Sequence, residues 1–502
     1  MKVKKSLKVR VNNFDSGLNI TRGENITDLD TSVDCYNFNF NKGVLLQGMG
    51  VKSLLIPTSK TSDEEKILPD YYDNQENIRT ISIFRDFNEP NNEYRDKLVF
   101  YCDDKALYYC NVNCLYPVVI KIPNTEFSSR PKTFQTKYKG KDIMIASNGV
   151  GKVMWWPGDS VPLAIENIPQ FVDMCEYKGF LYCIMSGDQN TIRYTTNTNL
   201  DSWSEELNSI FDKGEIVITD GLGKLNKLVN FQGHLYAFRD YSILKITQYE
   251  DAKKPLISTM YVSGNRIYPN TIQICGDEMI MLTTGGLIKF DGVVGKEIEL
   301  SFDNMLTSVD NQKAVATYHQ GKYFLACKMN YFDNEVVGAE SGENCVNNSL
   351  VCYDSKNGKY QIVRGLDISD IASIKSDIFN KLIICFYNGH TNVLAELTND
   401  GKFFDENSPK YWCSPLTDLG YSDCKKVIKQ VSLFSKYDCK LTIFTESEQK
   451  SYNISGSEII SKYPVRLCGK QIGFKIESNS TNAYISNLCL DIDLIDSGFS
   501  VW

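Results

Sequence analysis

The sequence has few histidines and lacks the short motifs that mark common catalytic sites. Only His234, His319 and His390 occur, and there is no His-x-His, His-Glu-x-x-His or Gly-x-Ser-x-Gly pattern. Cys110 and Cys114 are four positions apart with no histidine nearby, so we do not expect a zinc site there. No phosphate-binding loop is present either. These absences predict a protein without catalytic, cofactor or metal-binding residues.

The chain also lacks an excess of positive charge and long apolar runs. Its 502 residues include 54 Lys and Arg against 62 Asp and Glu, a net charge of −8, which argues against tight binding to nucleic-acid phosphates. No stretch of 18 apolar residues occurs, and no apolar segment follows the basic N-terminus, so we expect neither a membrane span nor a signal peptide. Most of the 16 cysteines lie in apolar runs and are interpreted as buried free thiols in a reducing cytoplasm.

A repeated turn-and-strand unit is the most informative feature that is present. Between about residues 78 and 400, a polar turn with glycine is followed by a short apolar strand, as in Tyr-Lys-Gly-Phe-Leu-Tyr-Cys at 177–183. The turns are typical of β-hairpins. Their glycines are spaced by 39, 54, 43 and 45 residues: Gly140, Gly179, Gly233, Gly276 and Gly321.

This period predicts an all-β fold, a β-propeller over residues 57–411. Repeats of 40–50 residues with several strands each are typical of propeller blades, because a four-stranded sheet must cover both faces against its neighbours. Six or seven blades both fit the pattern, and two stacked sandwiches are the rival arrangement. The polar segment 60–77 and the insertion 331–348 interrupt the repeat and are interpreted as loops, either solvated or in contact with partners.

The last part of the chain, residues 412–502, has a different pattern. Apolar and polar residues alternate, as in Lys-Leu-Thr-Ile-Phe at 440–444, which predicts a small antiparallel β-sandwich with one wet face. The region is locally basic and could be a solvated strand face or a docking surface for an acidic partner. The residues concerned are Lys425, Lys426, Lys429, Lys436, Lys440, Lys462, Arg466 and Lys470.

The first 56 residues, predicted to form an N-terminal arm and closing strands, carry a series of short motifs. The motif residues are Phe14, Gly17, Leu18, Asn19, Asn37, Gly43 and Gly50, and a Trp-x-Ser-Pro-x-x-Asp-x-Gly segment follows at 412–420. In this order, with the repeats between them, they resemble the tail nozzle, hub and stabilisation proteins of tailed bacteriophages. Ordinary turn chemistry is the alternative explanation for the N-terminal glycines.

The resemblance implies a structural virion protein. A member of this family would assemble in the host bacterial cytoplasm into a closed ring of about six copies below the portal. Its partners would be other copies of itself, the portal or adaptor and other tail proteins, and no membrane. DNA would pass along the ring without specific binding, held back until ejection, past electronegative walls that repel phosphates.

Two other functions fit the same pattern. One is a carbohydrate-binding or glycoside-hydrolysing propeller, which needs paired carboxylates at a central pocket. The nearest match to a sialidase-type turn is Asn199-Leu-Asp201-Ser-Trp203, which is single and imperfect. The other is a cellular propeller scaffold that binds proteins. A ring with a wide subunit interface, a pocket with converging acids, or an exposed apolar face would distinguish the three.

Overall fold

The computed structural model describes most of the chain. The described residues are 3–20, 28–40, 43–54, 78–111, 119–151, 153–159, 161–165, 168–195, 200–203, 213–248, 255–331, 346–375, 380–387, 392–404 and 406–496. Residues 60–77, most of the insertion 331–348 and His390 lie outside these ranges. The helices that are described are short, and none has the length and apolarity needed to cross a bilayer.

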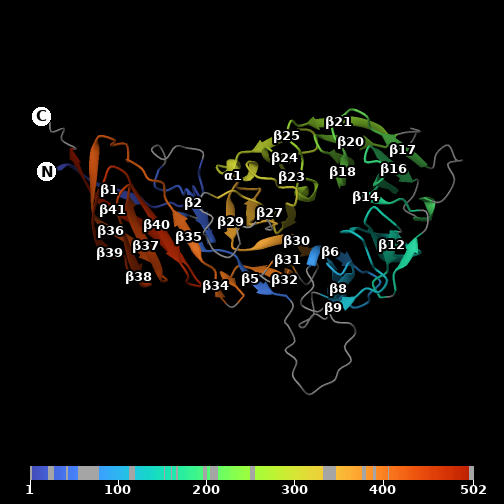
Figure 1. The fold of residues 1–502 in the computed structure, drawn as a ribbon, viewed down its shortest axis with the longest axis horizontal. Coiled ribbons are helices and arrows are strands. Elements are labelled where there is room, and N and C mark those ends of the chain that lie inside the picture. The colour runs from blue at the N-terminus through green and yellow to red at the C-terminus, as the bar shows by residue number, and fades with distance from the viewer. Residues whose placement is uncertain are drawn as a thin grey trace, which may run out of the picture.

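Seven sheets form a ring, so the predicted β-propeller is confirmed and has seven blades (Figure 1). Six are four-stranded meanders in chain order. Blade 1 is β6 (Ile78–Arg85), β7 (Asp96–Cys102), β8 (Leu107–Asn111) and β9 (Val119–Lys121); blade 2 is β10 (Lys132–Tyr138), β11 (Lys141–Ser147), β12 (Val153–Trp156) and β13 (Leu163–Ile165); blade 3 is β14 (Phe171–Tyr177), β15 (Phe180–Met185), β16 (Thr191–Thr195) and β17 (Lys213–Val217). Blade 4 is β18 (Leu225–Phe231), β19 (His234–Arg239), β20 (Ser242–Thr247) and β21 (Leu256–Val262); blade 5 is β22 (Gln273–Cys275), β23 (Glu278–Thr283), β24 (Gly286–Phe290) and β25 (Gly295–Ile298); blade 6 is β26 (Val315–His319), β27 (Lys322–Cys327), β28 (Ser349–Asp354) and β29 (Tyr360–Arg364).

The glycine turns join the first and second strands of blades 2 to 6. In four of them both turn residues have positive φ, for example Gln232 at 50° and Gly233 at 73°, with Phe231 paired to His234. This is the two-residue hairpin turn whose twist matches that of the strands. The other glycines of the set are Gly140, Gly179, Gly276 and Gly321, with φ between 73° and 82°.

Each boundary between neighbouring blades has its own apolar core. Between blades 7 and 1, for example, Ile374 and Ile383 pack with Leu98 and Phe100. Corresponding clusters lie at the six other boundaries. Cysteines contribute to them, and ten of the fourteen described cysteines are buried, as expected for thiols that act as small hydrophobic side chains.

The ring is closed by a strand from the N-terminal part of the chain. Blade 7 consists of β30 (Asp367–Lys375), β31 (Asn380–Tyr387), β32 (Asn392–Thr398) and then β5 (Gly50–Ser53), which pairs with β32. The short strands β33 (Lys402–Phe403) and β34 (Glu406–Asn407) continue this sheet beyond β5. Both ends of the propeller sequence are therefore held in one sheet.

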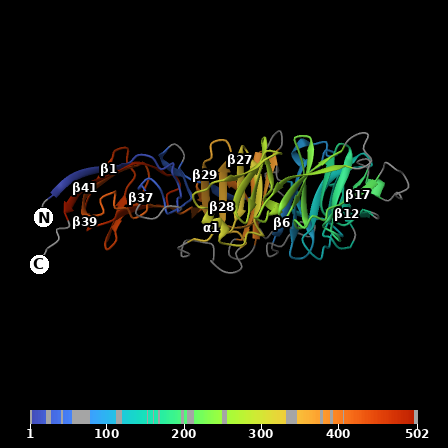
Figure 2. The same cartoon turned by 90° about the horizontal axis from the view of Figure 1, so that it is seen from above.

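The remaining strands form the confirmed β-sandwich beside the propeller, which gives the molecule an elongated, flat outline (Figures 1 and 2). One sheet has the order β3 (Phe38–Asn39), β4 (Leu45–Gln47), β41 (Tyr484–Asp496), β36 (Cys424–Ser435), β39 (Ser461–Gly469), with β1 (Val3–Val11) paired to β41. The other has the order β2 (Asp34–Tyr36), β35 (Lys410–Cys413), β40 (Ile472–Ser478), β37 (Cys439–Thr445), β38 (Gln449–Ile454). The sandwich thus begins at Lys410 rather than 412, and four strands of the expected N-terminal arm belong to it.

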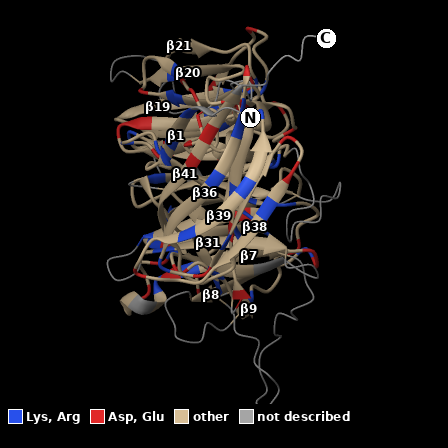
Figure 3. Cartoon of the chain, turned by 90° about the vertical axis from the view of Figure 1, so that its left-hand side faces the viewer, with Lys and Arg blue, Asp and Glu red and all other residues tan. Residues whose placement is uncertain are grey.

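Charges of both signs are mixed on the exposed strands of the sandwich (Figure 3). Lys429 pairs with Asp493 at 2.9 Å and Lys440 with Glu477 at 3.1 Å. Lys426 is buried and donates to backbone carbonyls, including that of Cys424 at 3.0 Å. Because Lys429 and Lys440 are paired with acidic residues and Lys426 is buried, the pattern favours a solvated strand face over a uniformly basic docking surface.

Replacing Gly50 with alanine should weaken the closure of the ring. A Cβ at this position would overlap the Asp400 carboxylate and lie 2.6 Å from the Lys402 carbonyl. We expect Gly50→Ala to lower the free energy of unfolding by about 1–3 kcal/mol, as overpacking generally does, and to speed amide exchange in β32. Gly264→Ala is the control, because nothing lies within 4 Å of its Cβ position. Equal stability of the two variants would show that β5 is not tightly held.

Candidate functional site

The predicted N-terminal motif residues gather where the sandwich meets the propeller. Phe14, Gly17, Leu18, Asn19, Asn37 and Gly43 lie in this junction, and Gly50 leads from it into the ring as the first residue of β5. The five hairpin glycines are dispersed over blades 2 to 6 and share no site. The junction is therefore the one place where the predicted residues act together.

A chain of aromatic side chains crosses the junction. Trp412 of β35 is completely buried and meets Phe14 edge-on at 5.3 Å and Phe40 at 5.8 Å between ring centroids. Phe40 contacts Tyr360 of blade 6 at 5.6 Å, and Tyr360 contacts Phe302 at 4.8 Å. These rings belong to one apolar cluster that runs from the sandwich into blades 5 and 6. The two lobes consequently share a hydrophobic core.

Gly17 lets the N-terminal segment approach this aromatic chain. Its φ is +60°, and a Cβ would lie 2.8 Å from both the Phe40 ring and the Tyr360 hydroxyl. The next residue, Leu18, is buried, and its carbonyl accepts a hydrogen bond from the Tyr360 hydroxyl at 2.7 Å. Asn19 then donates its backbone N–H to the Ser32 carbonyl at 2.7 Å. A glycine is therefore needed at position 17 because a larger residue would collide with Phe40 and Tyr360, and not only because the chain turns there.

Asn37 ties three segments of the chain together. It is fully buried, with a φ of 57° that asparagine tolerates better than most residues. Its side-chain amide donates to the carbonyls of Arg364 at 3.1 Å and Pro409 at 2.8 Å, and its side-chain oxygen accepts from the Arg364 N–H at 2.9 Å. Its own N–H donates to the Ile362 carbonyl at 2.9 Å. One side chain therefore joins the N-terminal segment, blade 6 and the entry into β35.

Asp15 provides a second polar link. Its carboxylate accepts the backbone N–H of Gly43 at 2.5 Å and forms an ion pair with Lys359 of blade 6 at 2.8 Å. Gly43, with a φ of 75°, in turn accepts the N–H of Phe14 at 3.3 Å. This network fixes the N-terminal loop against the propeller.

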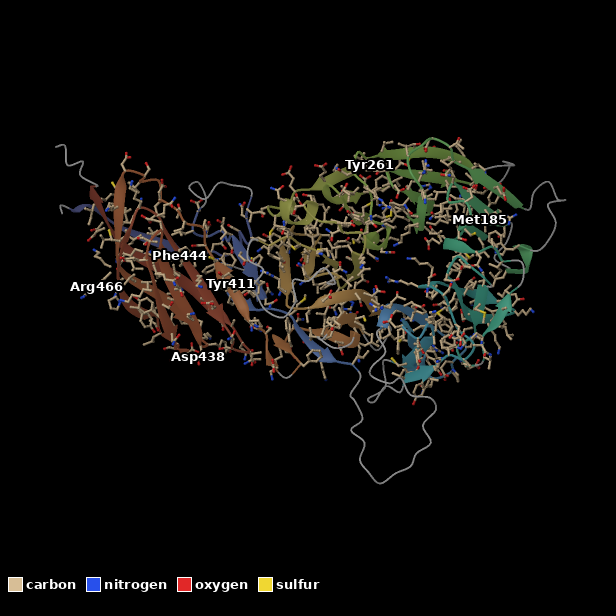
Figure 4. All side chains as sticks on the ribbon, in the orientation of Figure 1. Met185, Tyr261, Tyr411, Asp438, Phe444 and Arg466 are labelled. Carbon is tan, nitrogen blue, oxygen red and sulfur yellow. The ribbon has the colours of Figure 1, made fainter. Side chains whose placement is uncertain are left out.

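Arg364 is a junction residue that the sequence analysis did not single out. Its guanidinium lies 3.4 Å above the ring of Tyr331, 5.0 Å from that of Tyr36, and pairs with Asp34 at 3.4 Å. Tyr36 also stacks on Tyr411, which Figure 4 places on the propeller side of the sandwich, at 5.3 Å. No local pattern marks Arg364, because its partners come from distant parts of the sequence.

Burial shifts the protonation equilibria of two junction groups. Burial raises the pKa of Tyr360, so its hydroxyl stays protonated and remains a donor to Leu18. Burial lowers the pKa of Lys410 to about 8. The Lys410 ammonium donates to the carbonyls of Ser408 at 2.9 Å and Ser480 at 2.8 Å. Both groups hold segments of the junction together.

The other histidine and acidic residues considered in the sequence form no catalytic cluster in the described ranges. His319 is buried with its Nδ1 2.8 Å from the Ser373 hydroxyl, and burial lowers its pKa. His234 begins β19 at a hairpin turn, and burial likewise lowers its pKa. Trp203 ends a short 3-10 helix, Leu200–Trp203. Where residues are described, no group of three or more metal-ligating side chains occurs.

Comparisons with known proteins leave the family of the chain undetermined. No protein-family model matches it, and no curated protein matches. Among solved structures, BamB from Moraxella catarrhalis is similar with a TM-score of 0.38 and 10% identity, covering 65% of this chain and 84% of that one. YCF48 bound to D1 peptide has a TM-score of 0.40 and 13% identity, covering 69% and 97%. The propeller fold is therefore assigned from the strand pairings of this chain itself.

Removing the Asn37 side chain should loosen the junction. Asn37→Ala leaves the Arg364 N–H and two carbonyls without partners, and we expect the free energy of unfolding to fall by about 3 kcal/mol in chemical denaturation. Asn487→Ala is the matched control, because Asn487 also has positive φ, 54°, but is exposed. If both variants lost the same free energy of unfolding, the effect would come from the positive φ of the backbone and not from the hydrogen bonds of the Asn37 side chain.

The lowered pKa of Lys410 makes the junction sensitive to alkaline pH. The folded pKa of about 8 lies below the unfolded value of 10.5, so the folded state carries an unfavourable buried charge below pH 8. As pH rises from about 8 to 10.5, wild type should gain stability relative to Lys410→Met by up to ~3 kcal/mol. Paired denaturation curves across this range measure the difference. A pH-independent difference would contradict the assignment.

Proposed function

We propose that this β-propeller protein is a non-enzymatic scaffold in which the sandwich holds the propeller in one fixed orientation. The observation that supports this most strongly is the continuous core of the junction, where Trp412, Phe40 and Tyr360 connect the sandwich to blade 6. A shared core of this kind opposes independent movement of two lobes. Such a body presents its surfaces to partners at a set distance and angle.

The connections between the lobes support the same proposal. The chain enters the ring between β4, which ends at Gln47, and β5, which begins at Gly50. It leaves between β34, which ends at Asn407, and β35, which begins at Lys410. Each crossing is only two residues long, unlike flexible linkers, and the second is held by Asn37, whose amide donates to the Pro409 carbonyl at 2.8 Å. They favour a rigid scaffold over two tethered modules.

The residues at the axis of the propeller support a glycoside hydrolase less well than they support a scaffold. A cavity there is lined by Arg130, Lys132 and Lys227 as well as Asp370. Asp370 is engaged by Arg130 at 2.8 Å, whereas glycoside hydrolysis needs two carboxyl groups free to face the substrate. The charge pattern favours binding over hydrolysis.

A bacteriophage tail component is the finer form of the scaffold proposal. The residues that carry this resemblance, such as Phe14, Gly17 and Asn37, gather at the junction, so the motif coincides with the feature that defines the architecture. The proposal places this chain in a ring of about six copies in the virion tail. DNA would pass between copies, since Lys132 reaches across the propeller's own axis to Asn270 at 2.9 Å.

Single-particle cryo-electron microscopy of the purified chain tests both levels of this proposal. For the scaffold, we expect all particle classes to show the sandwich at one angle to the propeller, and a continuous range of angles would contradict it. For the tail component, we expect closed rings of about six copies at high protein concentration or with portal protein added. Monomers under all these conditions would overturn the tail assignment and leave the scaffold standing.

A further inference from the structure

A polar cavity of about 190 Å³ lies at the axis of the propeller. It is bordered by the inner strands β6, β10, β18, β26 and β30 and by the short helix Pro269–Thr271. Figure 4 shows side chains with nitrogen ends reaching into the middle of the ring. A cavity of ~150 Å³ can hold a six-carbon ring, so this one has room for a small organic group.

Bulges in the inner strands place polar side chains around this axis. The pairing of each inner strand with its neighbour is interrupted once near its start in blades 1, 3, 4 and 7. A bulge turns the strand and changes the direction of the side chain that follows. The residues at which pairing resumes are Thr80, Asp173, Lys227 and Asp370.

One of the three cations at the cavity already has a counterion. Arg130 donates to the Asp370 carboxylate at 2.8 Å and to the Thr80 hydroxyl at 2.7 Å. Asp370 also accepts the Ile81 N–H at 2.9 Å. This neutral group joins blades 1, 2 and 7, and it is a structural feature of the ring.

Lys132 and Lys227 have no such counterion. The Lys132 ammonium donates to the Asn270 side-chain oxygen at 2.9 Å and that of Lys227 to the Ile272 carbonyl at 2.8 Å. Each ammonium has three N–H donors, which leaves two for another partner. In the described part of the chain, no carboxylate lies within ion-pair distance of either lysine. Two positive charges therefore border the cavity, and neither has a carboxylate within ion-pair distance among the described residues.

The surroundings of both lysines make their charged forms costly. Burial lowers the pKa of Lys227 to about 8, and the nearby charge of Lys132 lowers it further while Asp173 opposes the shift. Desolvation by the surrounding strands, with the charge of Arg130, also lowers the pKa of Lys132, although part of its side chain contacts solvent. An anion between the two ammonium groups would favour their charged forms.

Asp173 lies close enough to both lysines to act on the same site. Its carboxyl accepts the Leu228 N–H at 2.7 Å, and burial raises its pKa while the charges of Lys227 and Lys132 oppose that shift. A carboxylate has one oxygen for each of the two ammonium groups. When Asp173 is ionised, it also repels the second charge of a phosphate dianion.

The cavity can be reached from one face of the propeller. Arg130 and Lys132 also border a second cavity of about 340 Å³, whose walls include Asn148 after β11 and Gln189 after β15. Both cations are solvent-exposed. A ligand can therefore approach the lysines from the side that carries these loops.

We propose that the axial cavity binds a monoanionic carboxylate through the ammonium groups of Lys132 and Lys227. The carboxylate belongs either to a small organic acid or to the C-terminus of a polypeptide. Both present two acceptor oxygens, which match the free donors of the two lysines. The site is separate from the junction and does not depend on the scaffold function.

Isothermal titration calorimetry on the full chain tests the proposal. The probes are acetate, the peptide acetyl-Ala-Ala-Ala with a free carboxylate, the same peptide amidated, and inorganic phosphate. We expect saturable binding of acetate or the free-acid peptide and none of the amidated peptide. Tighter binding of the peptide than of acetate would identify a chain terminus, and the reverse would identify a small acid. Binding of the amidated peptide, preference for phosphate, or no carboxylate binding would overturn the proposal.

Matched variants separate binding from a structural role of the lysines. Lys132→Met and Lys227→Met should each weaken carboxylate binding at least tenfold. Lys137→Met is the control, because Lys137 is exposed on the same strand, β10. Lys132→Gln removes the charge but keeps a donor for Asn270, and it covers the case in which Lys132→Met does not fold. Wild-type affinity in a folded Lys132→Gln variant would contradict the proposal.

Discussion

The pairing of β5 with β32 is the interaction on which the rest of this structure depends. A propeller blade is apolar on both faces, so the ring is stable only if its first and last blades meet. Here the closing strand comes from residues 50–53, directly after the last sandwich strand of the N-terminal segment. Closing the ring therefore also brings the sandwich to blade 6. The same course of the chain therefore closes the propeller ring and docks the sandwich against it.

The junction makes this coupling specific through polar as well as apolar contacts. An apolar core alone tolerates shifts between two surfaces, whereas buried hydrogen bonds are satisfied in few arrangements. Asn37 meets this requirement with partners in two segments besides its own, and Arg364 adds contacts to the rings of Tyr331 and Tyr36. Any rotation of the sandwich would leave buried donors and acceptors unpaired. The geometry of the two lobes is thus set by a small number of groups.

The sequence predicted those features that local patterns encode. Glycine turns such as Gln232–Gly233 reveal hairpins, and alternation at 440–444 reveals a sandwich strand, because both depend on neighbouring residues. The sequence analysis did not assign β1–β4 to the sandwich, since strands as short as β2 pair with partners hundreds of residues away. Some of the charged residues around the axial cavity are placed there by β-bulges, and residue propensities do not predict where bulges occur. A charged residue within an apolar inner strand, such as Asp173 or Lys227, was the available signal.

Native-state hydrogen exchange tests the central claim, that ring closure and sandwich docking form one cooperative unit. The amides to compare are those of β32 in the closing blade, β29 in blade 6 and β35 in the sandwich. If the account holds, all three groups open with the same free energy and respond equally to denaturant. If β35 opens at much lower free energy while β32 and β29 stay protected, the sandwich is an independent module and the account is wrong.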